Sequence, residues 1–421
     1  MKRLLAALGF LLAVAALAVL ALLARESSQD FTASGAAAAA TSAAQIERGQ
    51  YLVRAGDCIA CHTAQGGVAY AGGRRIPTPF GALYSTNLTP DADTGLGHWS
   101  ADDFWRALHF GRSRDGRRLY PAFPYPDYTR VTRADADAMF AFLRALPPTR
   151  ADAPAQELRF PYRTQLALRL WRALWFKPGV FEADPRQSES WNRGAYLVEG
   201  LGHCGACHTA RNRFGVPIRA QAYAGGPIPM LGWDALPLTA PRSLSNAEAA
   251  QIAELLKTGV NAHSAAAGPM AEVIFHSLQY LDAGDLSAMV EYLRAQPYRE
   301  PATARHLRVP ENERRRLRAT GEKIYAKHCA DCHGDQGEGQ PYRAPALAGS
   351  RLLTAPSAAD AIQLVRYGGF SPSTAAVPQP YGMPSYSQTL SPDDIAAVLS
   401  YARGAWGNEA GPVAPTEVGR D

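Results

Sequence analysis

CIACH (residues 58–62), CGACH (204–208) and CADCH (329–333) contain all six cysteines of the 421-residue chain. Each stretch repeats the pattern C-x-x-C-H, which is typical of covalent attachment of a c-type haem. On a helical turn, positions i and i+3 lie on one face, so both thiols can reach the two vinyl groups of one porphyrin. The histidine that follows can then bind the iron from the proximal side. We therefore predict three covalent haems, attached at Cys58, Cys61, Cys204, Cys207, Cys329 and Cys332, with His62, His208 and His333 as proximal ligands.

Other uses of paired cysteines explain the pattern less well. Disulfides would suit an oxidising compartment, but they would not require a histidine after every pair. Zinc sites also use C-x-x-C pairs, yet the pairs of this chain stand more than a hundred residues apart. A thioredoxin-like redox motif would not occur three times. Haem attachment remains the favoured interpretation.

The sequence around the motifs also repeats. RGQYLV (48–53) precedes the first motif, RGAYLV (193–198) precedes the second, and GEKIYAKH (321–328) takes this place before the third. A middle helix that opens with serine and an early acidic residue is expected in each copy, over residues 100–111, 245–259 and 357–369. A closing helix with apolar residues at helical spacing follows, over residues 132–148, 282–298 and 391–406. We predict an all-α protein of three tandem cytochrome c domains with long ordered loops.

The domain boundaries follow from these repeats and from local composition. Cytochrome c domains are expected at 46–146, 191–296 and 318–408. Between and around them we expect a flexible linker at 26–45, a linker with an aromatic amphipathic helix at 147–190, a basic linker at 297–317 and a tail at 409–421. In the second linker, Trp171 and Trp175 lie one helical turn apart. That helix either packs on a neighbouring domain or forms a docking surface for the membrane or a partner subunit.

The first 25 residues indicate export from the cytoplasm. After Lys2 and Arg3, the chain has no charge and no proline from Leu4 to Ala24. The apolar part of a secretory signal usually has ~7–15 residues, whereas a helix that spans a bilayer needs ~20. We expect an uncleaved anchor at 1–25, with a cleaved signal peptide as the alternative. Since Lys2 and Arg3 should stay in the cytoplasm, the rest of the chain is expected on the periplasmic side of the bacterial inner membrane.

Methionine commonly binds a c-type haem opposite the histidine, and it raises the potential of the haem. Met270, in a Gly-Pro turn of the second copy, and Met383, in YGMPSY of the third, are the predicted distal ligands. Met139 and Met289 fall within the predicted closing helices and are expected to fill the core. Met230 lies before the middle helix and is a weaker rival to Met270.

The first copy has no methionine at the distal position. LYPAFPY (119–125) places Phe123 where the third copy has Met383, and a phenyl ring has no lone pair for iron. The sixth ligand of the first haem is therefore unknown: this iron is five-coordinate, or it takes a ligand from elsewhere. His98 is one candidate, with a surface or capping role as the alternative, and His109 is less suitable.

Charge and motifs exclude several other functions. The net charge of +5 is small and the acidic and basic residues are well mixed, whereas a nucleic-acid-binding protein concentrates basic residues in a stripe. No nucleic-acid partner is therefore expected. The sequence contains no dinucleotide-binding glycine motif, zinc-protease helix motif or nucleophile elbow. The chain alone is not expected to oxidise an organic substrate.

Several long strings of sequence resemble one known family. They include YSTNLTPDADTGLGHWS (84–100), WNRGAYLVEGLGHCGACHT (191–209) and GMPSYSQTLSPDDIAAVLSY (382–401), together with residues 48–63, 119–125 and 268–273. Over residues 47–406 the chain resembles the cytochrome c subunit of membrane-bound alcohol and gluconate dehydrogenases. Similar subunits accompany molybdenum aldehyde and N-heterocycle dehydrogenases. Members of the family often have methionine where this chain has Phe123, and others have phenylalanine.

The resemblance implies a subunit that takes electrons from a separate catalytic subunit and passes them on. The expected function is therefore electron transfer by three covalently bound haem c groups, with the organic chemistry left to the partner. Expected partners are a dehydrogenase catalytic subunit, the membrane and, as acceptor, ubiquinone or a soluble cytochrome c. Two alternatives remain open: a peroxidase-like haem enzyme acting at an open first haem, and a freestanding carrier for a terminal oxidase or reductase.

Overall fold

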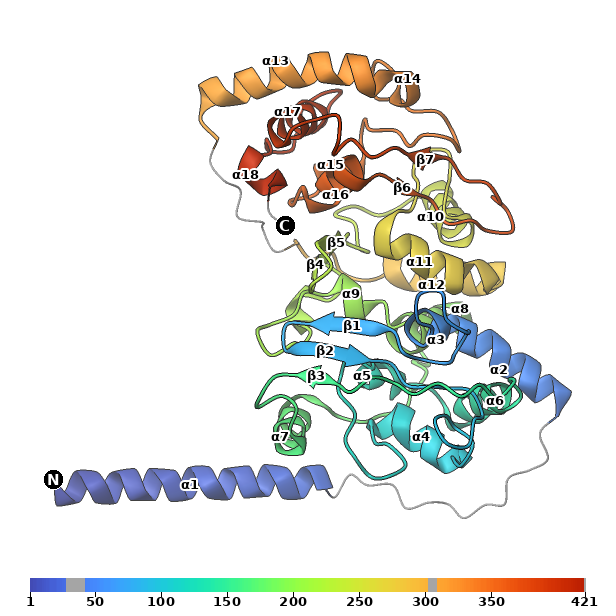
Figure 1. Ribbon diagram of the computed structural model, residues 1–421, viewed down its shortest axis with the longest axis vertical. Coiled ribbons are helices and arrows are strands. Elements are labelled where there is room, and N and C mark those ends of the chain that lie inside the picture. Colours follow the sequence, from blue (N-terminus) through green and yellow to red (C-terminus); the bar gives the residue numbers. More distant parts are fainter. Residues whose placement is uncertain (28–41, 302–308, 420–421) are drawn as a thin grey trace. The chain divides into compact units, whose positions relative to one another are not determined.

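The computed structural model describes residues 1–27, 42–301 and 309–419 (Figure 1). The chain divides into two units, residues 1–183 with 199–203 and residues 184–198 with 204–421. Both units are mainly helical, and short strands occur in the loops between the helices. Most of the predicted flexible linker, residues 28–41, and residues 302–308 of the predicted basic linker lie outside the described residues.

The first unit begins with a long apolar helix. Its helices are α1 (Lys2–Ser27), α2 (Ala43–Ala55), α3 (Cys58–Cys61), α4 (Ala101–Phe110), α5 (Tyr125–Tyr128), α6 (Arg133–Arg144) and α7 (Gln165–Trp175). Strands β1 (Arg75–Thr78), β2 (Gly81–Tyr84) and β3 (Glu157–Leu158) form an antiparallel sheet in that order, with Arg75 opposite Tyr84 and Gly81 opposite Leu158. Helix α1 ends two residues beyond the predicted anchor, because Glu26 in its last turn binds arginines of the same unit.

The second unit contains the other two motifs. Its helices are α8 (Glu189–Tyr196), α9 (Gly205–His208), α10 (Asn246–Thr258), α11 (Gly268–His276), α12 (Ala283–Arg294), α13 (Glu311–His328), α14 (Ala330–His333), α15 (Arg351–Thr354), α16 (Ala359–Tyr367), α17 (Pro392–Ala402) and α18 (Pro415–Val418). Two antiparallel pairs of strands are present, β4 (Gly226–Ile228) with β5 (Trp233–Ala235) and β6 (Gly369–Phe370) with β7 (Gly382–Met383). The sequence did not predict these strands or those of the first unit, all of which are only two to four residues long.

A crossing of two helices recurs in all three copies. The helix before each motif packs against the closing helix of the same copy: α2 on α6, α8 on α12 and α13 on α17. A Cβ atom built on Gly49, Gly194 or Gly321 would lie only 1.8, 2.0 or 2.0 Å from a backbone oxygen of the closing helix. A side chain cannot occupy that space, so glycine allows the two backbones to touch. This contact explains the glycine that the three leading segments share.

Ion pairs strengthen two of these crossings. Arg48, in RGQYLV, donates from Nε to Asp135 at 2.9 Å, and Arg193, in RGAYLV, donates from Nε to Asp285 at 2.7 Å. Both aspartates lie in the first turn of a closing helix and are buried, so the pairing satisfies charges that would otherwise be costly there. The third copy has Thr320 at the arginine position. Its leading segment therefore matches the other two less closely.

The predicted middle helices form as α4, α10 and α16. Ser100 and Ser245 cap the first two by accepting hydrogen bonds from the backbone of the third helical residue, and each cap is completed by an acidic side chain. Gly111 and Gly259 end these helices at φ values of 58° and 83°, where glycine is favoured. The third middle helix differs slightly, because its N-cap is Ala358 rather than the predicted serine.

The second and third copies pack together within the second unit. The carboxylate of Asp360, in the first turn of α16, accepts from the backbone N–H of Asp234 in β5 at 2.7 Å. Arg351 in α15 donates to the carbonyl of Pro237 at 2.7 Å. Burial raises the pKa of Asp360 to about 6. The contact between the second and third copies therefore contains a carboxyl group with a raised pKa.

Candidate haem-binding sites

Each C-x-x-C-H stretch folds into one tight helical turn after its leading helix. The N–H of the motif histidine donates to the carbonyl of the first motif cysteine, at 2.9 Å in the first two motifs and 3.0 Å in the third. Such an i to i+4 bond closes one helical turn. The structure therefore confirms the local geometry on which the attachment prediction rests, with both thiols and the imidazole carried by the same turn.

The three motif histidines share a second hydrogen bond. Nδ1 lies 2.6 Å from the carbonyl oxygen of Thr86 for His62, 2.7 Å from that of Leu236 for His208, and 2.9 Å from that of Pro345 for His333. Since a carbonyl oxygen can only accept, Nδ1 must carry the proton, and the lone pair of the ring is left on Nε2.

Burial favours the form of these rings that can bind a metal. It lowers the pKa of His62, His208 and His333 below the ordinary value for histidine, so the neutral imidazole is preferred. A neutral ring, oriented through Nδ1 and with Nε2 available, is the arrangement that metal-binding histidines usually show. The residues present thus fit an iron ligand at each motif.

The loop after each motif is bonded back onto the motif histidine. The N–H groups of Gly72, Gly225 and Gly339 donate to the histidine carbonyls at 2.8, 3.0 and 2.8 Å. In the first two copies the loop after the motif contains the sequence YAGG, at residues 70–73 and 223–226. The threonine after the histidine, Thr63 or Thr209, accepts from the backbone N–H of the tyrosine in that sequence at 3.1 Å. These bonds hold the loop of each copy against its motif.

The first cysteine of two motifs differs from a redox-active thiol. Burial raises the pKa of Cys58 to about 12 and that of Cys329 to about 11, whereas a redox-active thiol needs a low pKa. No disulfide joins the cysteines, all of which lie in described residues. Across residues 1–27, 42–301 and 309–419, no three His, Cys, Asp or Glu side chains converge to hold a metal ion.

The predicted distal methionines lie between the middle and closing helices of their copies. Met383 is half-buried in β7, and Met270 is half-buried in the first turn of α11, a helix that the sequence did not predict. Met139 and Met289 are buried in α6 and α12, as expected of residues that fill the core. Met230 lies between β4 and β5 and is largely exposed, which makes it a poor rival to Met270.

Phe123 lies just before α5, between the middle and closing helices of the first copy. Its ring packs on Tyr128 with the ring centroids 5.5 Å apart. The hydroxyl of Tyr128 donates to the carbonyl of Gly56, two residues before the first cysteine, at 2.6 Å. In the third copy the hydroxyl of Tyr386, close after Met383, donates to a carbonyl one residue before the motif at 2.7 Å. This shared tyrosine contact supports the match between the two distal segments.

The two histidines considered for the first copy lie in different surroundings. His98 is exposed in the loop before α4. His109 is buried in α4, where its ring stacks on Trp105 at 4.5 Å and Nδ1 lies 3.4 Å from the hydroxyl of Thr129. Burial also lowers the pKa of His109. These contacts make His109 a core residue of α4.

Comparisons with known proteins agree with this geometry. A family model described as cytochrome c matches residues 46–147 and 318–406. The alcohol dehydrogenase (quinone) cytochrome c subunit of Gluconobacter oxydans is 35% identical over 401 residues, which cover 89% of this chain and 81% of that relative. The chain belongs to the family of dehydrogenase cytochrome c subunits. The gluconate 2-dehydrogenase cytochrome c subunit of Pantoea cypripedii is 34% identical, with 87% of each chain covered.

Another relative is much longer. A nicotinate dehydrogenase subunit of Pseudomonas putida is 38% identical over 367 residues, which cover 86% of this chain but 30% of that relative. This chain thus spans less than a third of the length of that protein. Membership of the cytochrome c family implies covalently bound haem c, for which the motif turns supply the thiols and the imidazoles.

Sequence reasoning missed the groups that orient the ligands of this cytochrome c. The carbonyls of Thr86, Leu236 and Pro345 could not be recognised, because a backbone acceptor has no side-chain signature. Tyr128 and Tyr386 did have a signal: a tyrosine follows the distal position within a few residues in both copies.

Proposed function

We propose that this chain is the electron-transfer subunit of a periplasmic dehydrogenase, with three haem c groups in cytochrome c domains at 46–146, 191–296 and 318–408. The proposal rests chiefly on one observation: all three motif turns hold their histidine by the same Nδ1-to-carbonyl bond. When bound, haem c supplies a one-electron couple at its iron. The protein contributes the six thiols, the three proximal imidazoles and, in the second and third domains, the thioethers of Met270 and Met383.

The proposed partners of this chain are inferred from the names of its relatives. The names of the Gluconobacter and Pantoea proteins make them cytochrome c subunits of alcohol and gluconate dehydrogenases. By analogy, a catalytic subunit would deliver electrons to this chain, and ubiquinone or a soluble cytochrome c would accept them. The oxidation of the organic substrate then belongs to the partner.

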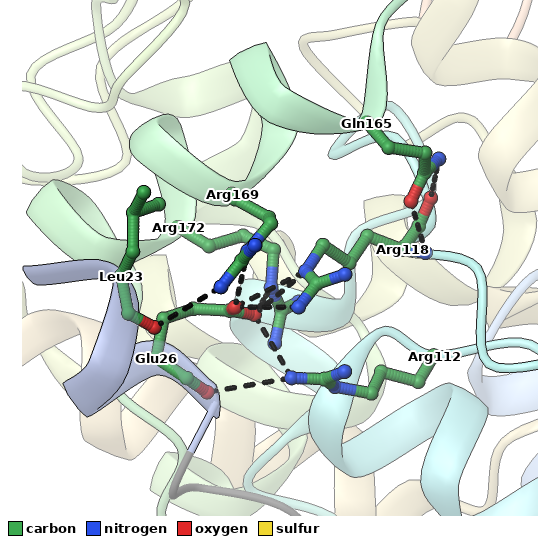
Figure 2. A network of polar contacts seen from close by, with 7 residues as sticks. All are labelled: Leu23, Glu26, Arg112, Arg118, Gln165, Arg169 and Arg172. Carbon is green, nitrogen blue, oxygen red and sulfur yellow. Dashed lines mark hydrogen bonds and ion pairs between the residues drawn. The ribbon is translucent and has the colours of Figure 1, made fainter. Parts of the chain in front are cut away.

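We further propose that α1 is retained and anchors the chain in the inner membrane, with the other domains in the periplasm. Residues 2–26 are long and apolar enough to cross a bilayer, with a hydropathy of 2.8 over their most apolar stretch, and the described side chains of that stretch are not buried in the protein. Glu26, by contrast, is 1% exposed and binds the guanidinium groups of Arg112, Arg118 and Arg172 at 3.0, 2.8 and 2.9 Å (Figure 2).

This carboxylate favours retention of α1 over cleavage. Arg172 is itself 1% exposed with α1 in place, so removal of α1 would take away both the anion that its guanidinium group faces and part of the packing around it. Breaking a buried ion pair by removing one partner typically costs ~3–5 kcal/mol. A cleaved signal peptide would not be expected to carry a residue on which the mature fold depends.

A second candidate function concerns the first domain. Phe123 stands where a methionine ligand is expected. Its ring has no lone pair for iron, and it packs on the ring of Tyr128. An iron without a sixth protein ligand can bind small molecules, so a peroxidase-like activity at the first haem is the alternative.

Purification of the intact chain from its native membranes tests these proposals. We expect three haems per polypeptide, a co-purifying dehydrogenase subunit, haem reduction by the substrate of that subunit, and a mature N-terminus that retains residues 2–27. Fewer haems would contradict the domain assignment, and a chain that begins after residue 27 would contradict the anchor. Turnover of hydrogen peroxide by the isolated chain, with carbon monoxide binding at one haem, would favour the alternative enzyme.

A further inference from the structure

Helix α7 buries a charged side chain and exposes apolar ones, the reverse of what is usual for a helix in water. Its inward side carries Arg172, which is 1% exposed, beside Leu168. Its outward side carries Leu166 and Leu174, which are 56% and 53% exposed. An amphipathic helix of a globular protein buries its apolar stripe and exposes its charges. The outward face of α7 is therefore suited to an apolar neighbour.

More apolar side chains are exposed near the two ends of α7. Phe160, in the loop before α7, is 75% exposed, and Trp175 at the end of the helix is 36% exposed. Trp171 and Trp175 lie one turn apart with their ring centroids at 6.0 Å. Tryptophan is enriched at the boundary between lipid and water, where its ring meets both environments.

The buried charge of α7 is held by the end of α1. Arg172 donates from Nε to the carboxylate of Glu26 at 2.9 Å, and Nε of Arg169 lies 3.6 Å from the same carboxylate. Arg169 also reaches the carbonyl of Leu23 in α1 at 3.4 Å. Figure 2 shows Arg169 and Arg172 converging on Glu26 together with Arg112 and Arg118. The ionic cluster thus fixes α7 beside the C-terminal end of α1.

The contact with the end of α1 determines the depth at which α7 would lie relative to a bilayer. The apolar span ends at Glu26, so that residue would lie at the periplasmic boundary of the hydrocarbon core if α1 crosses the membrane. Helix α7 packs against α1, and in Figure 1 it is seen nearly end-on beside the C-terminal part of α1, so the axes of the two helices run in different directions. A helix that crosses a membrane span near its end lies along the membrane surface, where amphipathic helices bury their apolar side to a depth of ~5–10 Å.

Charge points to the same neighbour. Arg169 lies one helical turn after Leu166, and its side chain is 31% exposed. A basic side chain at the headgroup level is attracted to anionic phospholipids. Leucines that point outward and an arginine beside them match the acyl chains and the phosphates of a lipid leaflet.

We propose that the outward face of α7, which carries Leu166 and Leu174, is a membrane-surface docking face that rests in the periplasmic leaflet, with the exposed rings of Phe160 and Trp175 near the two ends of the helix. The inference rests on the proposed function of α1 as a retained anchor. It adds a second membrane contact, which fixes the orientation of the first cytochrome domain rather than merely tethering it.

Spin labels on the full-length haem-loaded chain test this proposal. Cysteine is introduced at Leu174 (L174C), at Leu12 (L12C) in the middle of α1, and at Val68 (V68C), an exposed loop residue of the same unit that serves as the control. The chain is placed in vesicles of phosphatidylethanolamine and phosphatidylglycerol. Collision with oxygen, which concentrates in lipid, is then compared with collision with a water-soluble nickel chelate.

We expect the label at position 174 to collide with oxygen and to be shielded from the nickel chelate, like the label at 12 and unlike the label at 68. A lipid signature at 12 with an aqueous signature at 174 would overturn the docking face and leave the anchor intact. Aqueous signatures at both positions would overturn the docking face and the anchor together. Shielding of position 174 from both reagents, found only when a dehydrogenase subunit is bound, would assign the face to that protein and also overturn the proposal.

Discussion

Replacing Gly321 with alanine tests the helix crossing that recurs in the three copies. The new methyl carbon would lie 2.0 Å from the carbonyl oxygen of Ala397 and 2.9 Å from Cβ of Tyr401. Ordinary contact begins near 3.4 Å, so α13 and α17 would have to separate by roughly 1.4 Å. Such overpacking typically costs ~1–3 kcal/mol, and separation also loosens the buried side chains of Ile395 and Leu399.

Helix propensity opposes this cost without cancelling it. Because the closest contact is with backbone, the cost of overpacking should lie in the upper part of its range, ~2–3 kcal/mol. Alanine is favoured over glycine inside a helix by ~1 kcal/mol, so we expect a net loss of about 1–2 kcal/mol of unfolding free energy in Gly321→Ala. For a domain of this size that corresponds to a fall in Tm of about 5–10 °C.

Hydrogen exchange measured by mass spectrometry on the haem-loaded chain locates the effect. Peptides from α13 and α17 should exchange faster in Gly321→Ala, and the thermal transition of this domain should move down. Gly404→Ala is the matched control, because its Cβ would meet its nearest neighbour, the carbonyl oxygen of Ser400, at an ordinary 3.6 Å. If Gly321→Ala and Gly404→Ala behave alike, the crossing does not require glycine and the reasoning is refuted.

Three further predictions concern the distal positions and pH. Phe123→Met should give the first haem a methionine-ligated spectrum and a higher reduction potential; an unchanged spectrum and potential would show that the distal segment of the first copy is wrongly assigned. Met383→Ala should lower the potential of the third haem and let its reduced form bind carbon monoxide, whereas a low-spin spectrum unaffected by carbon monoxide would exclude Met383 as the ligand. Asp360→Asn should remove part of the pH dependence of stability, because burial raises the pKa of this carboxyl from 3.8 to about 6. Its folded pKa lies above its unfolded pKa, so its contribution is complete below pH ~4 and is lost as the pH rises through ~6, by at most about 3 kcal/mol. Urea unfolding at pH 5 and pH 8 should therefore differ less in Asp360→Asn than in the natural chain, and equal differences would contradict the assignment.

The local features of the fold could be predicted from the sequence because they depend on neighbours along the chain. The capping serines Ser100 and Ser245 each bind a backbone group three residues away, and the motif turns close within five residues. The burial of Met139 and Met289 followed from helical spacing alone. Periodicity and short-range hydrogen bonding carry this information.

The features that could not be predicted depend on partners far away in the chain. Glu26 binds Arg112 across 86 residues and Arg172 across 146 residues. Nothing near residue 26 indicates which side chains will surround its carboxylate, so the sequence only suggested the start of a linker there. The carbonyls that accept from the motif histidines, 12 to 28 residues further on, are hidden for the same reason.

The helix crossings also determine the order in which the parts of each copy can pack as the chain emerges. Arg48 and Asp135, which meet at the first crossing, are 87 residues apart, and Arg193 and Asp285 are 92 residues apart. A chain that emerges N-terminus first presents each cysteine pair well before the closing helix of that copy exists. A short leading helix is only marginally stable until it has a partner to pack on. Each motif therefore passes through an interval in which the helix before it has no partner, and packing of the closing helix ends that interval.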